Sequence, residues 1–490
     1  MSVEIERKFR LPEGGRIRAL DGVTLGAGDE LSLRAVYFDT PDLVLARRGI
    51  TLRRRTGGHD EGWHLKLPGE GHAREEIGAE ILPGASTTRV PHLLRSHVAD
   101  VVKRAPLVPV ARLDTARRET PLLDEGGTTV ALLCEDQVTV RRGTEEHAWQ
   151  EVEVELTPAG HEGDLDAISR ALEAQGAQAQ PATSKLVQAL GSLLTQRTED
   201  QPRSAAQVIG DYLATQVGMV QAMEPEVRAD APDAVHKLRV ACRRLRSVLR
   251  VYRALMDAER TEALRTELKW LGEVLGGPRD AEVLRERLHE GLDLMPDEGI
   301  LGPVRERLAT ELDARHAAAH AAMVAALDEE RYAGLLEALT CLLTDPPFLP
   351  GAERPARQVL PRHLDRATRR VSMRWAAACA AKRPEKMELA HEARKKTKAS
   401  RYAWEAAIPA LPNAERAAAA WKQVTESLGV AQDTVVSRAR LLELTAAAGE
   451  AGEPTFTYGV LYGRELAHQD DARGVADRAV RIARRASRTH

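Results

Sequence analysis

Glutamate and lysine alternate with other residue types near the start of the chain, in the segment Glu4–Lys8. Because successive side chains of a β-strand point to opposite faces, Glu4, Glu6 and Lys8 would share one face. The same period of two returns in the segment Trp149–Leu156. Three glutamates would share a face there: Glu151, Glu153 and Glu155. Carboxylates this close repel one another unless a cation neutralises them. An oxygen-only cluster suits Mg²⁺ or Mn²⁺ better than zinc, so the two segments indicate a metal site.

Basic residues alternate in the same way in the segments between these two. Arg53 and Arg55 would share one strand face, as would His64 and Lys66, and Arg74 follows them. Guanidinium groups bind phosphate oxygens in pairs of hydrogen bonds, and a metal ion can bridge carboxylates to the same anion. A barrel with both kinds of charge inside would therefore suit a metal-bound phosphate chain. The same faces could equally be the solvated side of an amphipathic sheet with cross-strand ion pairs, and the period alone leaves both interpretations open.

The order of these motifs resembles that of the CYTH family, the triphosphate tunnel metalloenzymes. Glu4–Phe9 is similar to the ExExK signature of that family. The further segments that agree are Tyr37–Pro41, Leu52–Arg55, Trp63–Lys66, Arg74 with Glu75 and Glu76, Glu151–Glu155 and Ser184–Leu186. The resemblance covers roughly residues 1–193. It implies an eight-stranded antiparallel barrel that forms a tunnel, a divalent metal ion (Mg²⁺ or Mn²⁺) and hydrolysis of a triphosphate.

The resemblance also implies roles for individual residues. The metal ligands would be Glu4, Glu6, Asp136, Glu153 and Glu155. The phosphate-binding residues would be Lys8, Arg53, Arg55, Lys66, Arg74, Lys185 and Arg117 or its neighbour Arg118. Glu4, Glu6 and Lys8 would be the catalytic residues. We expect metal-assisted transfer of a phosphoryl group to water, in which positive groups neutralise the oxyanions and a second ion or a glutamate positions the water.

A basic helix face is predicted in the second part of the chain. His236, Arg239, Arg243, Arg246 and Arg250 follow a 3-4-3-4 spacing, which places all five on one face of a helix. A solvated helix face usually interleaves acids that form i,i+4 ion pairs. The segment from His236 to Arg250 contains no Asp or Glu. Because such a helix repels itself, the pattern favours a groove that is occupied by an anion.

The same design recurs at an offset of 155 residues. The matching residues are His391, Arg394, Lys398 and Arg401, with Lys395 and Lys396 beside them. Further on, Leu275–Asp280 matches Leu428–Asp433 at an offset of 153. The sequence therefore predicts two similar helical units, about residues 204–344 and 357–490, in a pseudo-twofold arrangement that places both basic helices around one surface.

These paired motifs resemble the CHAD family over roughly residues 204–490. The resemblance implies two pseudo-symmetric helical bundles around a basic cavity that binds inorganic polyphosphate. The residues that would bind it are His236, Arg239, Arg243, Arg246, Arg250, His391, Arg394, Lys395, Lys398 and Arg401. The two histidines would donate hydrogen bonds to phosphate oxygens. Two departures from the repeat are Glu392 opposite Lys237 and Gln432 opposite Arg279. Nucleic acid is the competing anion, but aromatic residues make up only 3% of the chain, so platforms for base stacking are scarce.

The elements that must position these residues differ between the two parts of the chain. Residues 1–195 contain short alternating segments separated by turn residues, which predict an antiparallel β-domain with inserted helices. Residues 196–203 are polar and are interpreted as a linker. Residues 204–490 are rich in Ala, Leu and Arg at helical spacing, which predicts an all-α domain. The fold class is therefore α+β multidomain.

Composition sets limits on the class of protein. The net charge of the 490 residues is −3, but residues 1–200 carry 25 Lys and Arg against 32 Asp and Glu, and the remainder carries 45 against 41. The four cysteines lie far apart without metal-ligand spacing, so a disulfide framework or a zinc site is not expected. No apolar run is long enough to span a membrane and no signal sequence is evident, so we expect a cytoplasmic protein without a membrane partner.

The sequence thus favours a triphosphatase coupled to a polyphosphate-binding domain. The alternative is a non-catalytic or weakly catalytic protein that binds to polyphosphate granules. Adenylate cyclase-like or thiamine triphosphatase activity also remains open, because the same grip on a triphosphate serves those reactions. No specific nucleic acid is expected as a partner, and the sequence does not determine the oligomeric state.

Overall fold

The computed structural model describes residues 2–487, apart from residues 13–16, 18, 21, 69–72, 82–88, 104, 143–144, 182–183, 192–193, 195–201 and 383–384. The chain divides into two compact units: Met1–Gln201 with Leu339–Pro346, and Pro202–Ala338 with Pro347–His490. Most of the predicted linker, residues 196–201, lies outside the described residues. In the described part of the chain, no helix is both long and apolar enough to cross a membrane.

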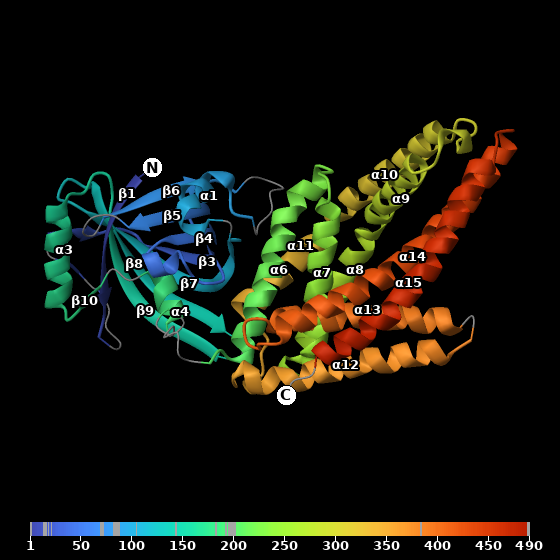
Figure 1. Ribbon diagram of the computed structural model, residues 1–490. Helices are drawn as coiled ribbons and strands as arrows, with labels where there is room; N and C mark the ends of the chain where they lie inside the picture. The colour runs from blue at the N-terminus through green and yellow to red at the C-terminus, as the bar shows by residue number, and fades with distance from the viewer. Residues whose placement is uncertain are drawn as a thin grey trace. The chain divides into compact units, whose positions relative to one another are not determined.

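The first unit is an antiparallel sheet whose strands close into a ring (Figure 1). In ring order the strands are β1 (Ser2–Arg10), β6 (Ala73–Ala79), β5 (Gly62–Pro68), β4 (Thr51–Thr56), β3 (Asp29–Asp39), β7 (Val108–Leu123), β8 (Thr129–Arg142) and β9 (Glu145–Leu156), and β9 pairs with β1 again. Two short strands are added to this ring: β2 (Thr24–Leu25) pairs with β7, and β10 (Gln178–Gln180) pairs with β1. The sheet therefore has ten strands, of which eight form the predicted barrel.

Helices cover the apolar outer face of the barrel. The short helices α1 (His92–His97) and α2 (Ala99–Val102) bury Leu94 and Val102 against a cluster that includes Phe38 and Trp63. Helix α3 (Glu162–Ala174) buries a second set of side chains against β1, β8 and β9. The members of this second cluster include Phe9, Leu133, Val152, Val154, Leu165, Ile168 and Leu172. Since the apolar side chains of these strands pack outward, the charged side chains on the alternate positions face the interior.

Helix α4 (Lys185–Leu190) packs against the inner face of the barrel. The Ser184 hydroxyl accepts a hydrogen bond from the backbone N–H of Val187, which caps the first turn of this helix. Leu186 and Leu190 are buried in a cluster with inner-face side chains of the strands. Those side chains include Ala35, Tyr37, Leu113 and Val138. This packing anchors α4 and leaves Lys185, at its first residue, to face the polar part of the interior.

The second unit is helical throughout, and its helices repeat in order. The first half contains α6 (Ala205–Arg228), α7 (Ala234–Val251), α8 (Ala258–Val274), α9 (Gly276–Asp293) and α10 (Val304–Leu327). After α11 (Glu330–Thr344), the second half contains α12 (Ala356–Ala380), α13 (Glu385–Ala407), α14 (Ala414–Glu450) and α15 (Phe456–Ala486). The pair α8–α9 occupies the place that the single helix α14 takes in the second half. Short 3-10 helices lie at Ala46–Arg48, Arg253–Leu255, Asp297–Gly299 and Pro350–Ala352.

The two halves meet through matching contacts. The backbone N–H of Ala205 donates to the carbonyl of Arg354 at 3.0 Å, and the N–H of Ala356 donates to the carbonyl of Arg203 at 2.9 Å. These reciprocal bonds relate the start of α6 to the start of α12 at an offset of 151 residues, as a pseudo-twofold relation requires. At the other end of the unit, α9, α10, α14 and α15 share one apolar cluster (Figure 1). The predicted pair of pseudo-symmetric helical bundles is therefore confirmed.

Candidate active site and anion-binding surface

The strand register places the predicted charged residues of the barrel on one face. In the pairing of β1 with β9, Glu6 lies opposite Glu155 and Lys8 opposite Glu153. In the next pairings, Arg117 lies opposite Asp136 and Asp136 opposite Glu151. On the other side of the ring, Glu4 pairs with Arg74, Lys66 with Glu76, Arg53 with His64 and Tyr37 with Arg53. Residues directly opposite each other in a sheet share a face, so all these positions line the interior.

A buried ionic cluster lies on this inner face. Arg117 donates from Nε and Nη2 to the two carboxylate oxygens of Asp136, both at 2.8 Å, and from Nη2 to Glu153 at 3.0 Å. The ammonium of Lys185 lies 3.0 Å from Asp136, 2.5 Å from Glu151 and 2.7 Å from Glu153. Lys8 contacts Glu153 closely and lies 4.0 Å from Glu6. Asp136 and Glu153 are each only 3% exposed, so this network is not a solvated face.

The cations keep the buried carboxylates ionised. Burial opposes the charged form of Glu153, but the charges of Lys185, Lys8 and Arg117 outweigh it and hold the pKa of this carboxyl well below its usual range. Burial likewise opposes the charge of Lys185, but Glu153, Asp136 and Glu151 raise its pKa well above the ordinary value. The pKa of Asp136 is lowered for the same reason, since Lys185 and Arg117 overcome its burial. The cluster is therefore a set of true ion pairs.

The cluster contains more acidic than basic groups. Three cations, Lys8, Arg117 and Lys185, lie among five carboxylates. These carboxylates are Glu6, Asp136, Glu151, Glu153 and Glu155. Two sets of three have ligand oxygens within 4.8 Å of one another: Glu6 with Glu153 and Glu155, and Asp136 with Glu151 and Glu153. Oxygen ligands and an excess of negative charge fit a hard divalent cation such as Mg²⁺ or Mn²⁺. Of the predicted ligands, only Glu4 has a side chain outside the described part of the structure.

Basic residues line the inner face on the opposite strands of the ring: Arg53, Arg55, His64 and Lys66, which we call the basic wall. Burial, with the nearby charges of Arg53 and Arg117, lowers the pKa of Arg55 to about 10, and Arg55 contacts Asp60. His64 lies 2.8 Å from Glu76, and Lys66 lies 3.9 Å from the same carboxylate. The side chain of Arg74 is outside the described residues. The predicted basic residues and the acidic cluster therefore lie on the same inner surface.

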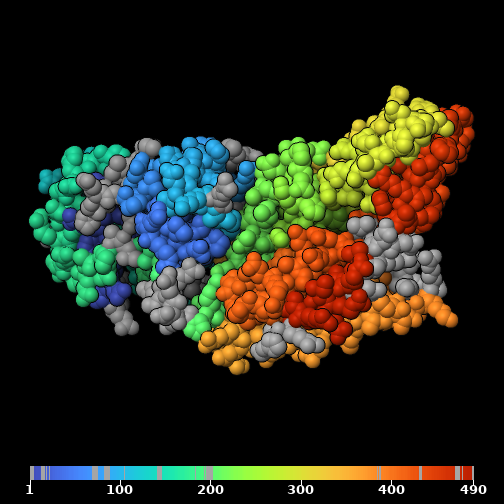
Figure 2. All heavy atoms as spheres, in the orientation of Figure 1, coloured from blue at the N-terminus to red at the C-terminus, as the bar shows by residue number. Residues whose placement is uncertain are grey.

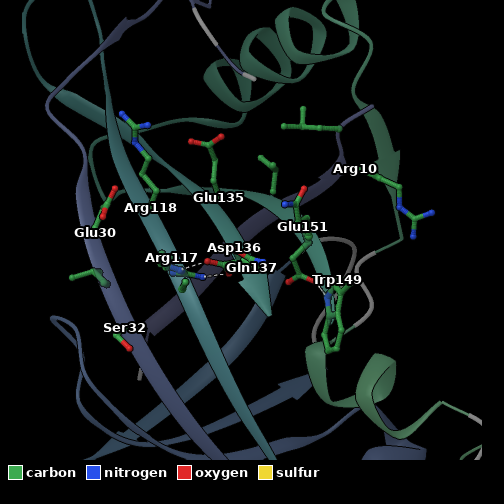
Figure 3. A pocket seen from close by; sticks show the side chains of 15 residues that line it. Arg10, Glu30, Ser32, Arg117, Arg118, Glu135, Asp136, Gln137, Trp149 and Glu151 are labelled. Carbon is green, nitrogen blue, oxygen red and sulfur yellow. Dashed lines mark hydrogen bonds and ion pairs between the residues drawn. The ribbon is translucent and has the colours of Figure 1, made fainter. Parts of the chain in front are cut away.

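A cavity of about 900 Å³ borders the ionic cluster (Figure 3). Its lining includes Arg117, Asp136 and Glu151 from the cluster. In Figure 3 the Arg117–Asp136 pair is joined by dashed lines, whereas Arg118 and Glu135 extend away from it. Arg118 is exposed and Arg117 is buried, so of these two neighbouring arginines Arg117 is the one that faces the cluster. Many of its other lining residues, such as Ser32, Arg118 and Gln137, occupy the alternate strand positions, so this cavity lies mainly against the outer face of the sheet and is not the interior of the barrel. The space among the inner-face residues Arg53, Arg55, Arg117 and Lys185 is about 20 Å³.

Two residues of this site were not among the predicted metal-binding or phosphate-binding residues. Glu151 belongs to one of the two carboxylate sets, and Glu76 links His64 to Lys66. The signal for Glu151 was its position two residues before Glu153, on the same strand face. The signal for Glu76 was the same period of two, counted from Arg74.

A second cluster of charge lies where α7 packs against α13. Burial, with the charges of Arg243, Arg394 and Arg239, lowers the pKa of Lys398 to about 6. Burial and neighbouring arginines also lower the pKa of Arg394. Two aspartates at matching positions of the repeat lie beside these cations: Asp280 bonds Arg239 at 3.0 Å, and Asp433 interacts with Arg394 and Lys398. The predicted basic helices therefore share one surface.

The remaining predicted residues of this surface differ in their surroundings. Arg246 and Arg250 extend the cluster toward Arg265. Their own burial is the largest cause that lowers the pKa of both, and the charge of Arg265 is the next. His236 and His391 are half-buried. Arg401 is bonded to Glu405 at 2.8 Å. Lys395 points away from the shared surface: its side chain is 60% exposed and pairs with Glu392.

Domain-family models match both parts of this chain. The CYTH domain family matches residues 2–190, and the CHAD domain family matches residues 211–442. An uncharacterized protein of Mycobacterium tuberculosis, Rv2226, is 36% identical over 98% of this chain and 96% of its own. Human thiamine-triphosphatase is 40% identical over 67 residues, which are 14% of this chain and 27% of that protein. The solved CHAD domain from the plant Ricinus communis covers 58% of this chain and 93% of its own, with 26% identity and a TM-score of 0.46.

Proposed function

This chain is a CYTH-CHAD protein, with a CYTH domain followed by a CHAD domain, and from that premise we propose that its barrel hydrolyses inorganic triphosphate or a related triphosphate while its helical unit binds polyphosphate. The observation that carries the first part is the buried inner cluster, in which five carboxylates face three cations. A buried cluster with more carboxylates than cations destabilises the fold unless a further cation binds to it, because an unpaired charge is costly to bury. The short match to thiamine-triphosphatase supports the reaction class.

Each residue of the barrel has a part in this proposal. Glu6, Glu153 and Glu155 hold the divalent ion with Glu4, and Asp136 supports them. Lys8, Arg117 and Lys185, with Arg53, Arg55, Lys66 and Arg74, bind the phosphate oxygens and offset the charge that develops on them. A bound Mg²⁺ or Mn²⁺ supplies Lewis-acid polarisation of those oxygens. Glu6 positions the attacking water.

The helical unit binds polyphosphate through the basic surface of α7 and α13. The residues are His236, Arg239, Arg243, Arg246, Arg250, His391, Arg394, Lys398 and Arg401. Lys395, the remaining predicted residue, is left out of the proposal because its side chain is exposed and pairs with Glu392. The observation that supports this is the crowding of cations around Lys398, whose pKa falls to about 6. A polyanion between the two helices would relieve that repulsion.

Substrate and metal are tested together with the full-length protein. Phosphate release is measured from inorganic triphosphate, thiamine triphosphate and a nucleoside triphosphate, with Mg²⁺ or Mn²⁺, and cyclic nucleotide formation is measured in parallel. We expect Glu153→Gln to abolish release while polyphosphate retention is unchanged, and the exposed Glu125→Gln to match the wild type. If no triphosphate is cleaved under any of these conditions, the enzymatic part is wrong and the polyphosphate-granule binding protein is favoured.

Polyphosphate binding is tested by reversing charge in the α7–α13 surface. Arg239→Glu with Arg394→Glu should remove retention on immobilised polyphosphate and leave hydrolysis of short triphosphates intact. Lys395→Glu is the matched control, because Lys395 lies on α13 but is exposed and paired with Glu392. Equal loss of binding and hydrolysis would contradict the division of labour between the two units.

A further inference from the structure

Helix α12 carries a row of exposed arginines for which neither the fold nor the proposed site accounts. Arg362, Arg366, Arg369, Arg370 and Arg374 are all exposed. Their spacing of 4, 3, 1 and 4 residues places them along one side of the helix. We call these five side chains the α12 stripe. Over twelve residues the stripe runs about 18 Å along the helix. In Figure 2, α12 is the light orange helix at the lower edge of the helical unit.

The stripe is almost free of acidic neighbours. Between Glu353 and Glu385, the only acidic residue in the sequence is Asp365. None of Arg366, Arg369, Arg370 and Arg374 forms an ion pair with another residue that the structure describes. A helix face kept soluble by charge normally mixes both signs, because like charges at i,i+4 destabilise the helix. The stripe therefore carries repulsion that solubility does not require.

Comparing α12 with the matching helix of the first half shows whether the fold requires these arginines. The reciprocal bonds of Ala205 and Ala356 align α6 with α12 at an offset of 151. At that offset, the positions of Arg362, Arg366, Arg369, Arg370 and Arg374 are occupied in α6 by Asp211, Thr215, Gly218, Met219 and Met223. Helix α6 therefore takes the same place in its half of the unit without one arginine at these positions. The arginines of α12 are not required to build this fold.

The stripe continues the basic surface of α7. Burial is the largest cause that lowers the pKa of Arg250, and the charges of Arg265, Arg246 and Arg370 follow in that order. Arg250 is the last residue of the acid-free face of α7, and α12 packs against both α7 and α13. A row of cations thus runs from the cluster around Lys398, through Arg246 and Arg250, to Arg370 on the outer helix, with Glu273 beside Arg246 and Glu392 beside Arg250.

We infer that the α12 stripe is an outer binding track for long polyphosphate chains, which leave the α7–α13 surface past Arg250 and continue along α12. This inference rests on the proposed polyphosphate binding and extends it. A flexible chain of phosphates can follow a row of guanidinium groups, each of which can take two oxygens of one phosphate. Because α6 lacks the row, the track exists on one side of the pseudo-symmetric unit only. Short chains fill the inner surface, and only longer chains reach the track.

The experiment compares long-chain polyphosphate with tripolyphosphate on the full-length protein. The variant Arg366→Gln/Arg370→Gln/Arg374→Gln should bind the long chain at least about tenfold more weakly, and its salt slope should fall by about 2 to 3. Its affinity for tripolyphosphate should be unchanged. The matched control replaces three arginines elsewhere in the unit, the half-buried Arg285 and the exposed Arg305 and Arg331, each of which has an acidic partner. The stripe residues are exposed, and retained helical circular dichroism checks the fold.

The outcomes separate the track from the inner site. Unchanged long-chain affinity in the stripe variant, or equal loss for the long chain and for tripolyphosphate, would overturn the track. Loss of duplex DNA binding with unchanged long-chain polyphosphate binding would overturn it in favour of a nucleic-acid surface. Failure of the wild type to bind the long chain would instead refute the proposed polyphosphate function itself, because tripolyphosphate can also bind in the barrel.

Discussion

Lys398 offers the sharpest test of the basic surface, because its charge is suppressed in the free protein. Burial is the largest cause that lowers the pKa of Lys398, and the charges of Arg243, Arg394 and Arg239 on α7 and α13 lower it further. Asp433 on α14 acts in the opposite direction, but the pKa still falls to about 6. Near neutral pH the amine is therefore largely neutral. A polyanion held between the two helices would reverse the local potential and restore the proton. Binding should thus take up a proton, and Lys398→Met should remove that uptake.

The size of the effect follows from the difference between about 6 and the ordinary value of 10.5. Between pH 9 and pH 6, an anion that restores the ordinary pKa should bind about tenfold more tightly for each unit by which pH falls, or about 4 kcal/mol over the whole interval. Below pH 6 the gain ends, because Lys398 is already protonated. The same linkage acts on folding: the unfolded chain holds this proton up to pH 10.5, so the free energy of unfolding falls as pH drops from 10.5 to about 6 and then levels off.

Calorimetric titration with long-chain polyphosphate, in two buffers of different ionisation enthalpy, measures the protons taken up on binding. We expect up to one more proton in the wild type than in Lys398→Met near neutral pH, and no difference below about pH 5. Subtracting the proton uptake of Lys398→Met from that of the wild type removes the protons taken up by His236 and by the phosphate chain ends, which are common to both proteins. Lys395→Met should behave as the wild type, because its side chain is exposed. Equal uptake by the wild type and Lys398→Met would refute the reasoning.

Three further predictions concern the stability of the barrel, each measured by chemical denaturation as a change in the free energy of unfolding. Arg117→Met leaves two buried carboxylates with less neutralising charge and should cost about 3 to 5 kcal/mol, whereas the exposed Arg118→Met should cost less than about 0.5 kcal/mol. Burial opposes ionisation of Glu76, but His64 and Lys66 hold its pKa at about 2, so its stabilisation of about 3 kcal/mol is present above pH 4.5 and is lost as pH falls through about 2. Glu76→Gln should therefore be less stable than the wild type at neutral pH and equal to it in strong acid. Asp39 accepts hydrogen bonds from the backbone N–H groups of Thr40, Leu45 and Ala46, so Asp39→Ala should cost about 2 to 3 kcal/mol; a loss no larger than that of the exposed Asp114→Ala would contradict it.

The period of two predicted which barrel side chains share a face, but not how the strands close. The pairing of β1 with β9 joins residues about 145 positions apart, and nothing local in the sequence specifies it. Strand β7 carries no simple hydrophobic alternation over residues 114–119, because its inner face presents Thr115, Arg117 and Glu119 while its outer face is also polar. Arg117 was therefore placed by resemblance and not by pattern. The period of two placed Glu151 on the face of Glu153 and Glu155, but its position opposite Asp136 needed the register of β8 with β9.

The basic faces of the helical repeat were easier to predict, because the residues that share one face of a helix follow from the spacing within a single segment. The 3-4 spacing placed Arg394 and Lys398 correctly on the surface that faces α7. Lys395 lies one residue, or about 100°, off that stripe, and this rotation is enough to expose it. The α12 stripe was not singled out from the sequence, because its meaning depends on the comparison with α6, and that comparison requires the structural alignment of the two halves.

The ion pairs inside the barrel also bear on how the protein would respond to metal scarcity. Many small metal sites fold only when the ion arrives, since their ligands repel one another without it. Here Lys185, Arg117 and Lys8 already neutralise part of that repulsion from within the chain. The barrel should therefore stay folded when divalent cations are withdrawn, and the proposed hydrolysis should recover on their return without refolding.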